Sequence, residues 1–512
     1  MIKHKVLGVV KMYRKRNREQ MTVEDFVPPY GGKLDARNRW VILAKIVPWD
    51  MIEEIYAKSF KTNSLDGRPP IPSRIAFGAL YIKEYENLPQ DRTMQHISEN
   101  VYMQYFLGLT EFIPSPFFDS SMLSHFANRF SKEDIAKINE EIYRRTRPPE
   151  EGSTKGGGND DSGGGAENED NDGKVNGVSA DKEDTINIDS AGNGGDAVPC
   201  ANNGTLIIDA TVAPADIRYT TDLSLLNECR EGTEKIIEDV WSETDRKGHK
   251  TAYNRKKARK GYLKIAKQRK PRKKQVRQAI REQLECVEKN VESLEGIFPN
   301  ISIESYLKHW GQFETIRKIA EQQRRHYDNP GEPIPDRIVS VSQPHVRPIV
   351  RGKARGEVEF GQKLNLSIVD GFTFIDNQSW DNFAEGVTLQ ASAEKYRERH
   401  GVYPQAILAD KTYRNRNNIN FCKERGIRLS GPRLGRPKAS EVESDKGQAY
   451  RDSCDRNIVE GRIGTNKRRY GLDLIYARKE NTGEVEAAIN VLCMNAAHVL
   501  RSQRPLPEPS KT

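Results

Sequence analysis

The sequence predicts an α/β protein in which an all-helical N-terminal domain precedes a mixed-sheet domain that carries a long helical insertion. Three observations predict this class. Residues 40–145 repeat apolar side chains at helical spacing. From residue 204 onward, short β-rich runs occur first in pairs and then in alternation with helical patterns, which is typical of a mixed sheet. Between those runs, residues 232–335 are highly charged and mainly helical, so we expect an insertion there.

The length of 512 residues exceeds what one compact core holds, and several domains are expected. We expect an N-terminal arm over 1–39, a helical domain over 40–145, an acidic linker over 146–202, the mixed-sheet domain over 203–503 and a tail over 504–512.

The helical domain shows one clear amphipathic helix over 75–85, followed by a polar break at 89–91. A second helical pattern ends at Gly108, and a third begins after Ser120 or Ser121 as N-cap. Helix, short turn and helix are compatible with a DNA-reading module. The same succession of elements also occurs in any small helical bundle, so both interpretations stay open.

The segment 147–200 is Gly, Asn, Asp, Glu and Ser with almost no large apolar groups. Such a segment cannot bury enough surface to offset its ordering entropy, so we expect a disordered acidic linker. The alternative is an electrostatic mimic of DNA that occupies a basic surface.

The mixed-sheet domain is predicted from alternating patterns along the rest of the chain. Strands are expected at 205–208, 337–342, 357–376, 404–409, 427–429 and 472–476, and helices at 387–400, 412–425, 446–467 and 482–502.

The formal net charge is +9, and it is unevenly distributed. Residues 151–198 hold twelve acids and three bases, so the remainder of the chain carries an excess of about +18. An excess of this size favours a polyanionic partner such as nucleic acid. It would also serve solubility alone.

The six cysteines are scattered without zinc spacing, no apolar signal region opens the chain, and no stretch approaches the length of a membrane span. We therefore expect a cytoplasmic protein without a membrane partner.

A strongly basic run extends from Arg246 to Arg281, with seventeen Lys and Arg and no Asp or Glu. A run of charged residues usually forms a solvent-exposed face without a specific partner. A basic run that contains no Asp or Glu favours phosphate binding instead. The candidate DNA contacts in it are Lys256, Lys257, Arg259, Lys260, Arg272, Lys273 and Lys274.

Three acidic residues are the candidate metal ligands. Asp209 and Asp410 each end an apolar, strand-like run, and Glu460 lies in a helical stretch. A carboxylate at the tip of a buried strand is costly to desolvate unless a cation compensates it. Oxygen ligands suit Mg²⁺, and two such ions activate the attacking oxygen and stabilise the leaving oxygen in phosphodiester chemistry.

The helix around Glu460 adds a second signal. On a helical wheel, Arg456, Glu460 and Lys467 fall at about 0°, 40° and 20°, in one narrow stripe. Two cations flanking a metal-binding Glu make sense if they hold DNA phosphates. The alternative is an ordinary surface helix with an Arg–Glu ion pair. Asp370, near a strand end, is the main competitor of Asp410 for the second acidic position.

These acidic blocks resemble the N2, N3 and C1 regions of bacterial insertion-sequence transposases with a DDE site. The second block of that family reads D-x-(G/A)-(Y/F), and residues 410–413 read D-K-T-Y. The last block reads Y-x2-R-x3-E-x6-K, and this chain has Ser453, Arg456, Glu460 and Lys467 at those positions. Thr412 and Ser453 depart from the pattern. The segment after Asp209 and residues 40–145 are similar to the family-five group.

The resemblance implies a ribonuclease-H-like fold and a transposase with Mg²⁺ as cofactor, which Mn²⁺ replaces. It implies Asp209, Asp410 and Glu460 as catalytic metal ligands, and Arg456, Lys467 and Tyr413 as contacts to double-stranded DNA. The enzyme would bind terminal inverted repeats, nick the 3′ ends and join them to target DNA as at least a homodimer, in a bacterial nucleoid. The alternatives are a DNA-binding protein without catalysis and a metal-dependent nuclease without strand transfer.

Overall fold

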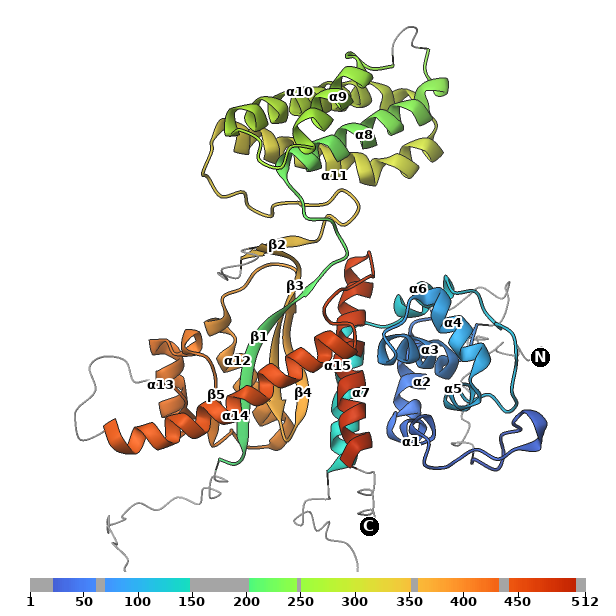
Figure 1. Ribbon diagram of the computed structural model, residues 1–512, viewed down its shortest axis with the longest axis vertical. Coiled ribbons are helices and arrows are strands. Elements are labelled where there is room, and N and C mark those ends of the chain that lie inside the picture. The colour runs from blue at the N-terminus through green and yellow to red at the C-terminus, as the bar shows by residue number, and fades with distance from the viewer. Residues whose placement is uncertain are drawn as a thin grey trace, which may run out of the picture. The chain divides into compact units, whose positions relative to one another are not determined.

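The computed structural model describes residues 22–60, 70–147, 202–245, 250–350, 358–431 and 442–502. The predicted acidic linker, the predicted tail and the first part of the N-terminal arm lie outside the described residues. The described chain combines an N-terminal helical region with a six-stranded mixed sheet and further helices (Figure 1). This confirms the predicted fold class.

The N-terminal region is helical, as predicted. Asn38 and Asn100 accept hydrogen bonds from the first backbone amides of α1 and α5 and so fix where those helices begin. The elements are η1 (Pro29–Gly31), α1 (Arg39–Ile46), α2 (Trp49–Lys58), α3 (Ser73–Tyr85), α4 (Gln90–Glu99), α5 (Val101–Phe106), α6 (Met122–Ala127) and α7 (Lys132–Thr146).

The helix α15 (Glu480–Ser502) joins the N-terminal helices to the sheet. It is buried along nearly its whole length and packs against α3, α7 and β4 (Figure 1). Asn139 of α7 and Asn495 of α15 both donate to the carbonyl oxygen of Thr373 in β4. One hydrophobic cluster therefore continues from the N-terminal helices to the sheet.

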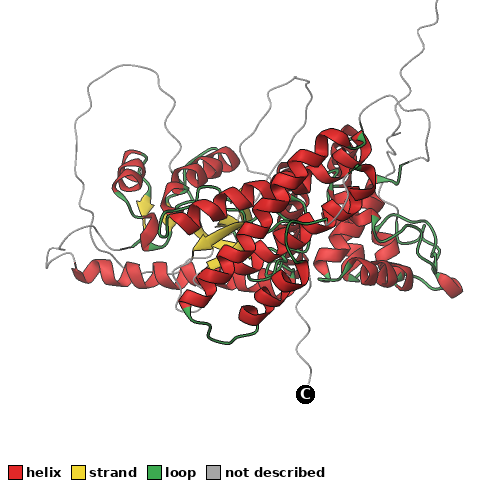
Figure 2. Ribbon diagram, turned by 90° about the horizontal axis from the view of Figure 1, so that it is seen from above, coloured by secondary structure: helices red, strands yellow, loops and turns green. Residues whose placement is uncertain are grey.

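The sheet has the strand order β2-β3-β1-β5-β6, with β4 paired to the long strand β3. The pairs among β1, β2, β3 and β4 are antiparallel, whereas β1–β5 and β5–β6 are parallel. The strands lie between helices (Figure 2). They are β1 (Thr205–Pro214), β2 (Arg347–Val350), β3 (Val358–Val369), β4 (Phe372–Ser379), β5 (Ala406–Leu408) and β6 (Arg428–Leu429).

The remaining helical elements of the sheet domain follow the predicted alternation. They are η4 (Glu385–Val387), α12 (Leu389–His400), η5 (Lys411–Tyr413), α13 (Arg416–Glu424) and α14 (Val442–Arg469).

Two predicted strands are wrong. Residues 337–342 form no strand and include a bend at 341–342, and Ile338 and Val341 pack into the core of the insertion. Residues 472–476 form only an isolated bridge between Ile475 and Ala215. In both segments the β-rich composition reflects burial of apolar side chains, not strand pairing.

The helical insertion has its own core. Leu226, Leu284 and Ile316, from three of its helices, meet in a cluster separate from that of the sheet. The first helix begins ten residues before the predicted start at 232, with Thr221 as its N-cap. The elements are α8 (Asp222–Val240), η2 (Trp241–Glu243), α9 (Arg255–Ala266), α10 (Lys273–Ile297), η3 (Phe298–Asn300) and α11 (Ile303–Asp328).

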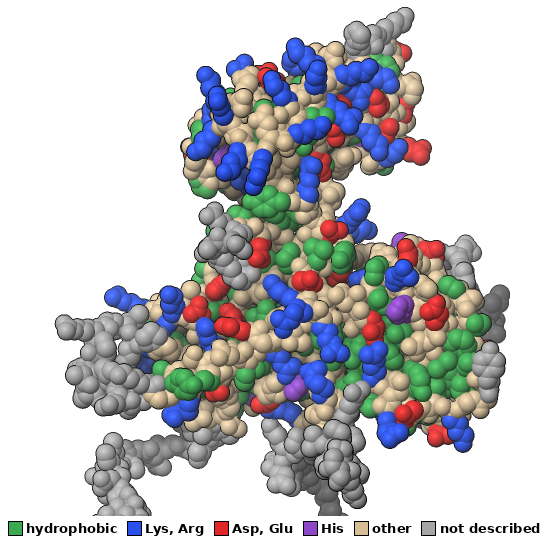
Figure 3. Space-filling view, viewed as in Figure 1, with side chains coloured by type: hydrophobic (Ala, Val, Ile, Leu, Met, Phe, Trp, Pro, Cys, Tyr) green, Lys and Arg blue, Asp and Glu red, His purple; other side chains and the backbone are tan. Residues whose placement is uncertain are grey.

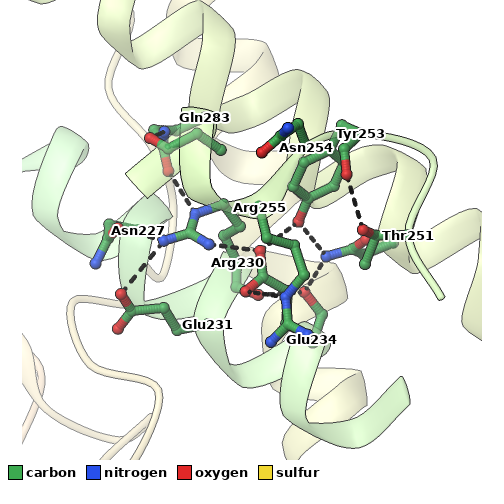
Figure 4. A network of polar contacts seen from close by, with 12 residues as sticks. Asn227, Arg230, Glu231, Glu234, Thr251, Tyr253, Asn254, Arg255 and Gln283 are labelled. Carbon is green, nitrogen blue, oxygen red and sulfur yellow. Dashed lines mark hydrogen bonds and ion pairs between the residues drawn. The ribbon is translucent and has the colours of Figure 1, made fainter. Parts of the chain in front are cut away.

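A buried polar network ties α9 to the rest of the insertion (Figure 4). The Arg230 side chain is 1% exposed; it pairs with Glu234 and donates to Gln283 of α10. Glu234 also accepts hydrogen bonds from Tyr253 and Arg255, at the start of α9. Since a buried charge needs a partner, Glu234 holds α8, α9 and α10 in one arrangement.

Among the described residues, five cysteines are unpaired. No described helix combines the length and apolarity that crossing a bilayer would require.

Replacing Glu234 by Ala is expected to destabilise the insertion by about 3–5 kcal/mol, because it leaves Arg230 buried without its buried carboxylate. Hydrogen exchange of the amides in α8–α10 measures this loss of protection. The matched control is Glu231→Ala, which removes a 52% exposed partner of the same guanidinium and costs about 0–1 kcal/mol. Equal protection in wild type and Glu234→Ala would contradict the proposed role of the network.

Candidate functional site

Asp209 and Asp410 lie next to each other in the sheet domain. Asp410 directly follows the short strand β5, as predicted, but Asp209 is not at a strand tip, because β1 continues past the predicted end at residue 208 to Pro214. Strands β1 and β5 pair in parallel with Ile207 opposite Leu408. Two residues further along each strand are Asp209 and Asp410, so the same register places them next to each other. The parallel pairing of the first part of β1 with β5 is what brings together residues two hundred positions apart.

Alternation along the strands sets the face on which the two aspartates lie. Ile207 and Leu408 pack against Val459 of α14, whereas Leu206 and Ile208 belong to the cluster that contains α12. Because side chains of a strand alternate between faces, Asp209 and Asp410 share the face of Ile207 and Leu408. That face is covered by α14.

The helix α14 brings Glu460 to the same place. Glu460 directly follows the buried Val459, which is in contact with the sheet. Arg456 lies between the two predicted ligands: Nη1 is 3.4 Å from Asp410 Oδ1, and Nη2 is 3.5 Å from Glu460 Oε1. The exposed fractions of the Arg456, Asp410 and Glu460 side chains are 30%, 43% and 60%. The site is therefore open to a large substrate.

Burial raises the pKa of Asp209 above its ordinary value, and the nearby carboxylates of Glu385 and Asp410 raise it further. The backbone amide of Ala210 and the guanidinium of Arg456 act in the opposite direction. The balance is unfavourable to the ionised aspartate, so an additional cation beside it would lower the energy of the charged form.

The carboxylates fit a divalent cation by their chemistry but are not yet gathered around one. Within the described part of the chain, no three His, Cys, Asp or Glu side chains form a group that could hold a metal ion. Asp209, Asp410 and Glu460 nevertheless provide only oxygen donors, which Mg²⁺ prefers, on one face of the sheet. Rotation of Asp410 and Glu460 away from Arg456 is what the geometry requires before they share an ion.

Tyr413 has a different position from the one expected of a DNA contact. Its side chain is fully buried, and its hydroxyl donates to Asn365 of β3 at 2.9 Å. A ring in this position supports the turn η5, which begins at Asp410, and offers no surface to DNA. We therefore remove Tyr413 from the candidate DNA contacts.

The other residues of the α14 stripe remain candidates. Lys467 lies further along the helix and is half-buried, and Ser453, in place of the family tyrosine, is exposed. Arg456 and Lys467 thus lie on the same helix as Glu460, as the stripe predicted, while a contact to DNA stays a prediction for both.

Asp370, the competitor of Asp410, lies elsewhere. It forms the two-residue turn between β3 and β4 with Gly371, and both residues have positive φ angles of 50° and 79°. Its carboxylate accepts a hydrogen bond from Tyr143 of α7 at 2.8 Å. Because β3 runs antiparallel to β1 and pairs Ile368 with Ile207, Asp370 lies toward the start of β1, at the opposite edge from Asp410.

The basic run forms an exposed surface on α9 and α10. Figure 3 shows Lys and Arg side chains over the insertion. Residues 246–249, at the start of the run, lie outside the described chain. Arg255 and Arg281 are paired with glutamates. All seven candidates in the run are exposed, and none has an ion-pair partner among the described residues: Lys256, Lys257, Arg259, Lys260, Arg272, Lys273 and Lys274.

Glu385 is the residue near the site that the sequence analysis missed. It opens η4, which precedes α12, and it acts electrostatically on Asp209. Acids are common at the first turn of a helix, so its position carried no distinctive signal. The structure draws attention to Glu385 through Lys363 of β3, which is buried and whose Nζ lies 3.1 Å from Glu385 Oε1.

Two protein-family models match the chain. The model described as "Transposase DDE domain" matches residues 407–496, and the one described as "Transposase domain (DUF772)" matches residues 29–129. The comparisons with curated proteins and with solved structures gave no match. The first family match contains Asp410 and Glu460, and the second covers most of the N-terminal helices.

Neither match distinguishes family five from other insertion-sequence groups, so that assignment stays a prediction. The mixed α/β fold is compatible with the ribonuclease-H-like domain that the resemblance implied. The two matches, in this order along one chain, support an insertion-sequence transposase of the DDE type.

Proposed function

We propose that this protein is a transposase that binds the terminal inverted repeats of its element, nicks the 3′ ends with divalent metal ions and joins them to target DNA. The observation that carries the proposal is the shared face of β1 and β5, where Asp209 and Asp410 lie side by side below Glu460 and Arg456. Site and fold alike suit phosphodiester chemistry on a duplex.

Asp209, Asp410 and Glu460 would hold the metal. A bound pair of divalent ions supplies an activated attacking oxygen and a stabilised leaving oxygen. The two aspartates are short ligands on a rigid sheet, whereas Glu460, on a helix and 60% exposed, has more freedom to adjust. The two aspartates would thus hold the metal in a fixed position, and Glu460 could adjust when the substrate binds.

Arg456 would change partners during the reaction. In the structure its guanidinium is close to Asp410 and Glu460 and partly neutralises their negative charge. Once those carboxylates hold a metal ion, the guanidinium is released toward solvent and becomes available to a DNA phosphate. Arg–phosphate contacts are among the stronger charge-assisted hydrogen bonds, so the exchange is energetically reasonable.

The exposed basic surface of α9 and α10 would bind the phosphate backbone of the same DNA. Contacts of this kind supply affinity and position without reading sequence. Joining two transposon ends requires two active sites in one complex, so we infer at least a homodimer during the reaction.

Replacing a metal ligand is expected to abolish cleavage. Asp209→Ala, Asp410→Asn and Glu460→Gln should each reduce Mg²⁺- or Mn²⁺-dependent nicking of a terminal-repeat duplex more than about 100-fold, since even residues that only support metal ligands change activity 10–100-fold. Equal cleavage by wild type and Asp209→Ala would overturn the proposal. Nicking without transfer to a second duplex would identify a nuclease. Salt-sensitive binding without strand breaks would identify a non-catalytic DNA-binding protein.

Asp209→Asn is expected to stabilise the metal-free protein at pH 7.5. The pKa of Asp209 is raised by burial, so its contribution to stability is greatest below about pH 3.9 and is lost as the pH rises through the folded-state pKa. The Tm of the variant should therefore exceed that of wild type at pH 7.5, by a difference that shrinks as the pH falls toward 4. Mn²⁺ should raise the Tm of wild type but not of the variant.

The control for this stability measurement is Asp381→Asn. Asp381 is 74% exposed, and its replacement should leave both the metal-free Tm and the response to Mn²⁺ unchanged. A lower metal-free Tm for Asp209→Asn than for wild type would show that the carboxylate contributes stability instead of costing it.

Removing two basic residues of α9 should weaken DNA binding in a salt-dependent way. Lys256 and Lys260 lie one turn apart, exposed and without ion-pair partners in the described chain. If both contact phosphates, the double Gln variant should lower the slope of log K against log salt by about 2. Binding of a terminal-repeat duplex between 50 and 200 mM salt measures the slope.

The matched double variant is Arg317→Gln with Lys318→Gln on α11. Both residues are paired with Glu314, so their replacement should leave the slope unchanged. Equal slopes for wild type and the Lys256/Lys260 variant would remove this surface from the proposed interface.

A further inference from the structure

Glu385 is held against the turn that carries Asp410. The next residue, Gly386, lies so close to η5 that a Cβ on it would be 2.7 Å from the carbonyl oxygen of Thr412. The carbonyl oxygen of Gly386 accepts hydrogen bonds from Asn415 and Asn418, at 3.2 and 2.6 Å. These contacts fix η4 beside η5, whose N-cap is Asp410.

The same residue is tied to the strand next to β1. Lys363 of β3 pairs with Val212, three residues beyond Asp209 in β1. The ammonium group of Lys363 is buried among Glu385, at 3.1 Å, and acceptors on Phe383 and Asn382. Glu385 is therefore anchored both to the Asp410 turn and to the strand that flanks Asp209.

The sheet leaves room for Glu385 to reach the site. Strand β1 pairs with β5 only as far as Ile207 and then continues to Pro214 with β3 as its partner. Beyond Ile207, β1 has no strand partner on its β5 side among the described residues, and η5, which follows β5, packs against η4. Glu460 approaches from α14 on one face, whereas Glu385 precedes α12, which covers the other face.

One oxygen of Glu385 remains available. Oε1 forms an ion pair with Lys363, and in the described part of the chain no partner contacts Oε2 of this 30% exposed side chain.

We propose that Glu385 is a fourth carboxylate of the divalent-cation site and binds the cation from the α12 side, directly or through a water molecule that the ion retains. This inference rests on the proposed metal site of Asp209, Asp410 and Glu460. The competing explanation is that Glu385 only neutralises Lys363. That explanation accounts for the ion pair of Oε1 with Lys363. It does not account for the contacts that hold η4 against the turn that begins at Asp410.

Mn²⁺ binding to the full-length protein tests the inference without relying on catalysis. Free Mn²⁺ is measured by electron paramagnetic resonance during titration of wild type, Glu385→Gln, Glu385→Asp and Asp209→Asn. We expect Glu385→Gln to raise the Kd for Mn²⁺ at least about tenfold, as losses around metal sites commonly do. Glu385→Asp keeps the charge on a shorter side chain and should recover part of the affinity.

Two controls separate binding from folding. Glu385→Gln leaves the buried Lys363 without its carboxylate, so its Tm without metal is expected to fall, and Mn²⁺ binding is measured at a temperature where the metal-free variant is folded. Glu394→Gln changes an acid on α12 that pairs with Arg397 and Tyr403, and it should leave the Kd unchanged.

The outcomes distinguish this inference from the proposed function. A loss of Mn²⁺ affinity in Asp209→Asn with wild-type affinity in Glu385→Gln would overturn the role of Glu385 and leave the three-residue site intact. Absence of Mn²⁺ binding in wild type would overturn both. Parallel losses in Asp209→Asn and Glu385→Gln, with Glu394→Gln unaffected, would support the four-carboxylate site.

Discussion

The parallel pairing of β1 with β5 is the constraint on which the candidate site depends. The side-chain period of a strand is two, so slipping either strand by one residue would move its aspartate to the other face of the sheet. The apolar residues before each aspartate oppose this, because a slip would break the contacts of Ile207 and Leu408 with Val459 and turn the aspartate toward the apolar cluster that contains α12. Hydrophobic packing thereby fixes the position of two hydrophilic groups.

That packing gathers negative charge that the protein only partly neutralises. Asp209, Asp410, Glu460 and Glu385 are accompanied by the guanidinium of Arg456 and the ammonium of Lys363. Arg456 is shared between two carboxylates at distances of 3.4 and 3.5 Å, longer than strong charged hydrogen bonds. Such loose pairing leaves the site with an excess of acid.

Local patterns in the sequence selected the candidate residues but not their contacts. The apolar runs ending in Asp209 and Asp410 and the stripe of α14 were visible because each depends on neighbours within a few positions. The burial of Tyr413 was not, because it depends on Asn365, far away in the chain. The same reason explains the two wrong strands and the missed Glu385, since strand pairing and the contacts of η4 come from distant segments.

The position of the insertion explains how a dense basic surface coexists with this sheet. The chain leaves the sheet at the end of β1 and returns to it at β2, which neighbours β3, so a long segment enters without changing the strand order. The insertion buries its own apolar cluster and satisfies its buried Arg230 with Glu234. The mutual repulsion of Lys and Arg on α9 and α10 is therefore opposed by packing within the insertion. It does not act on the strand register that places Asp209 beside Asp410.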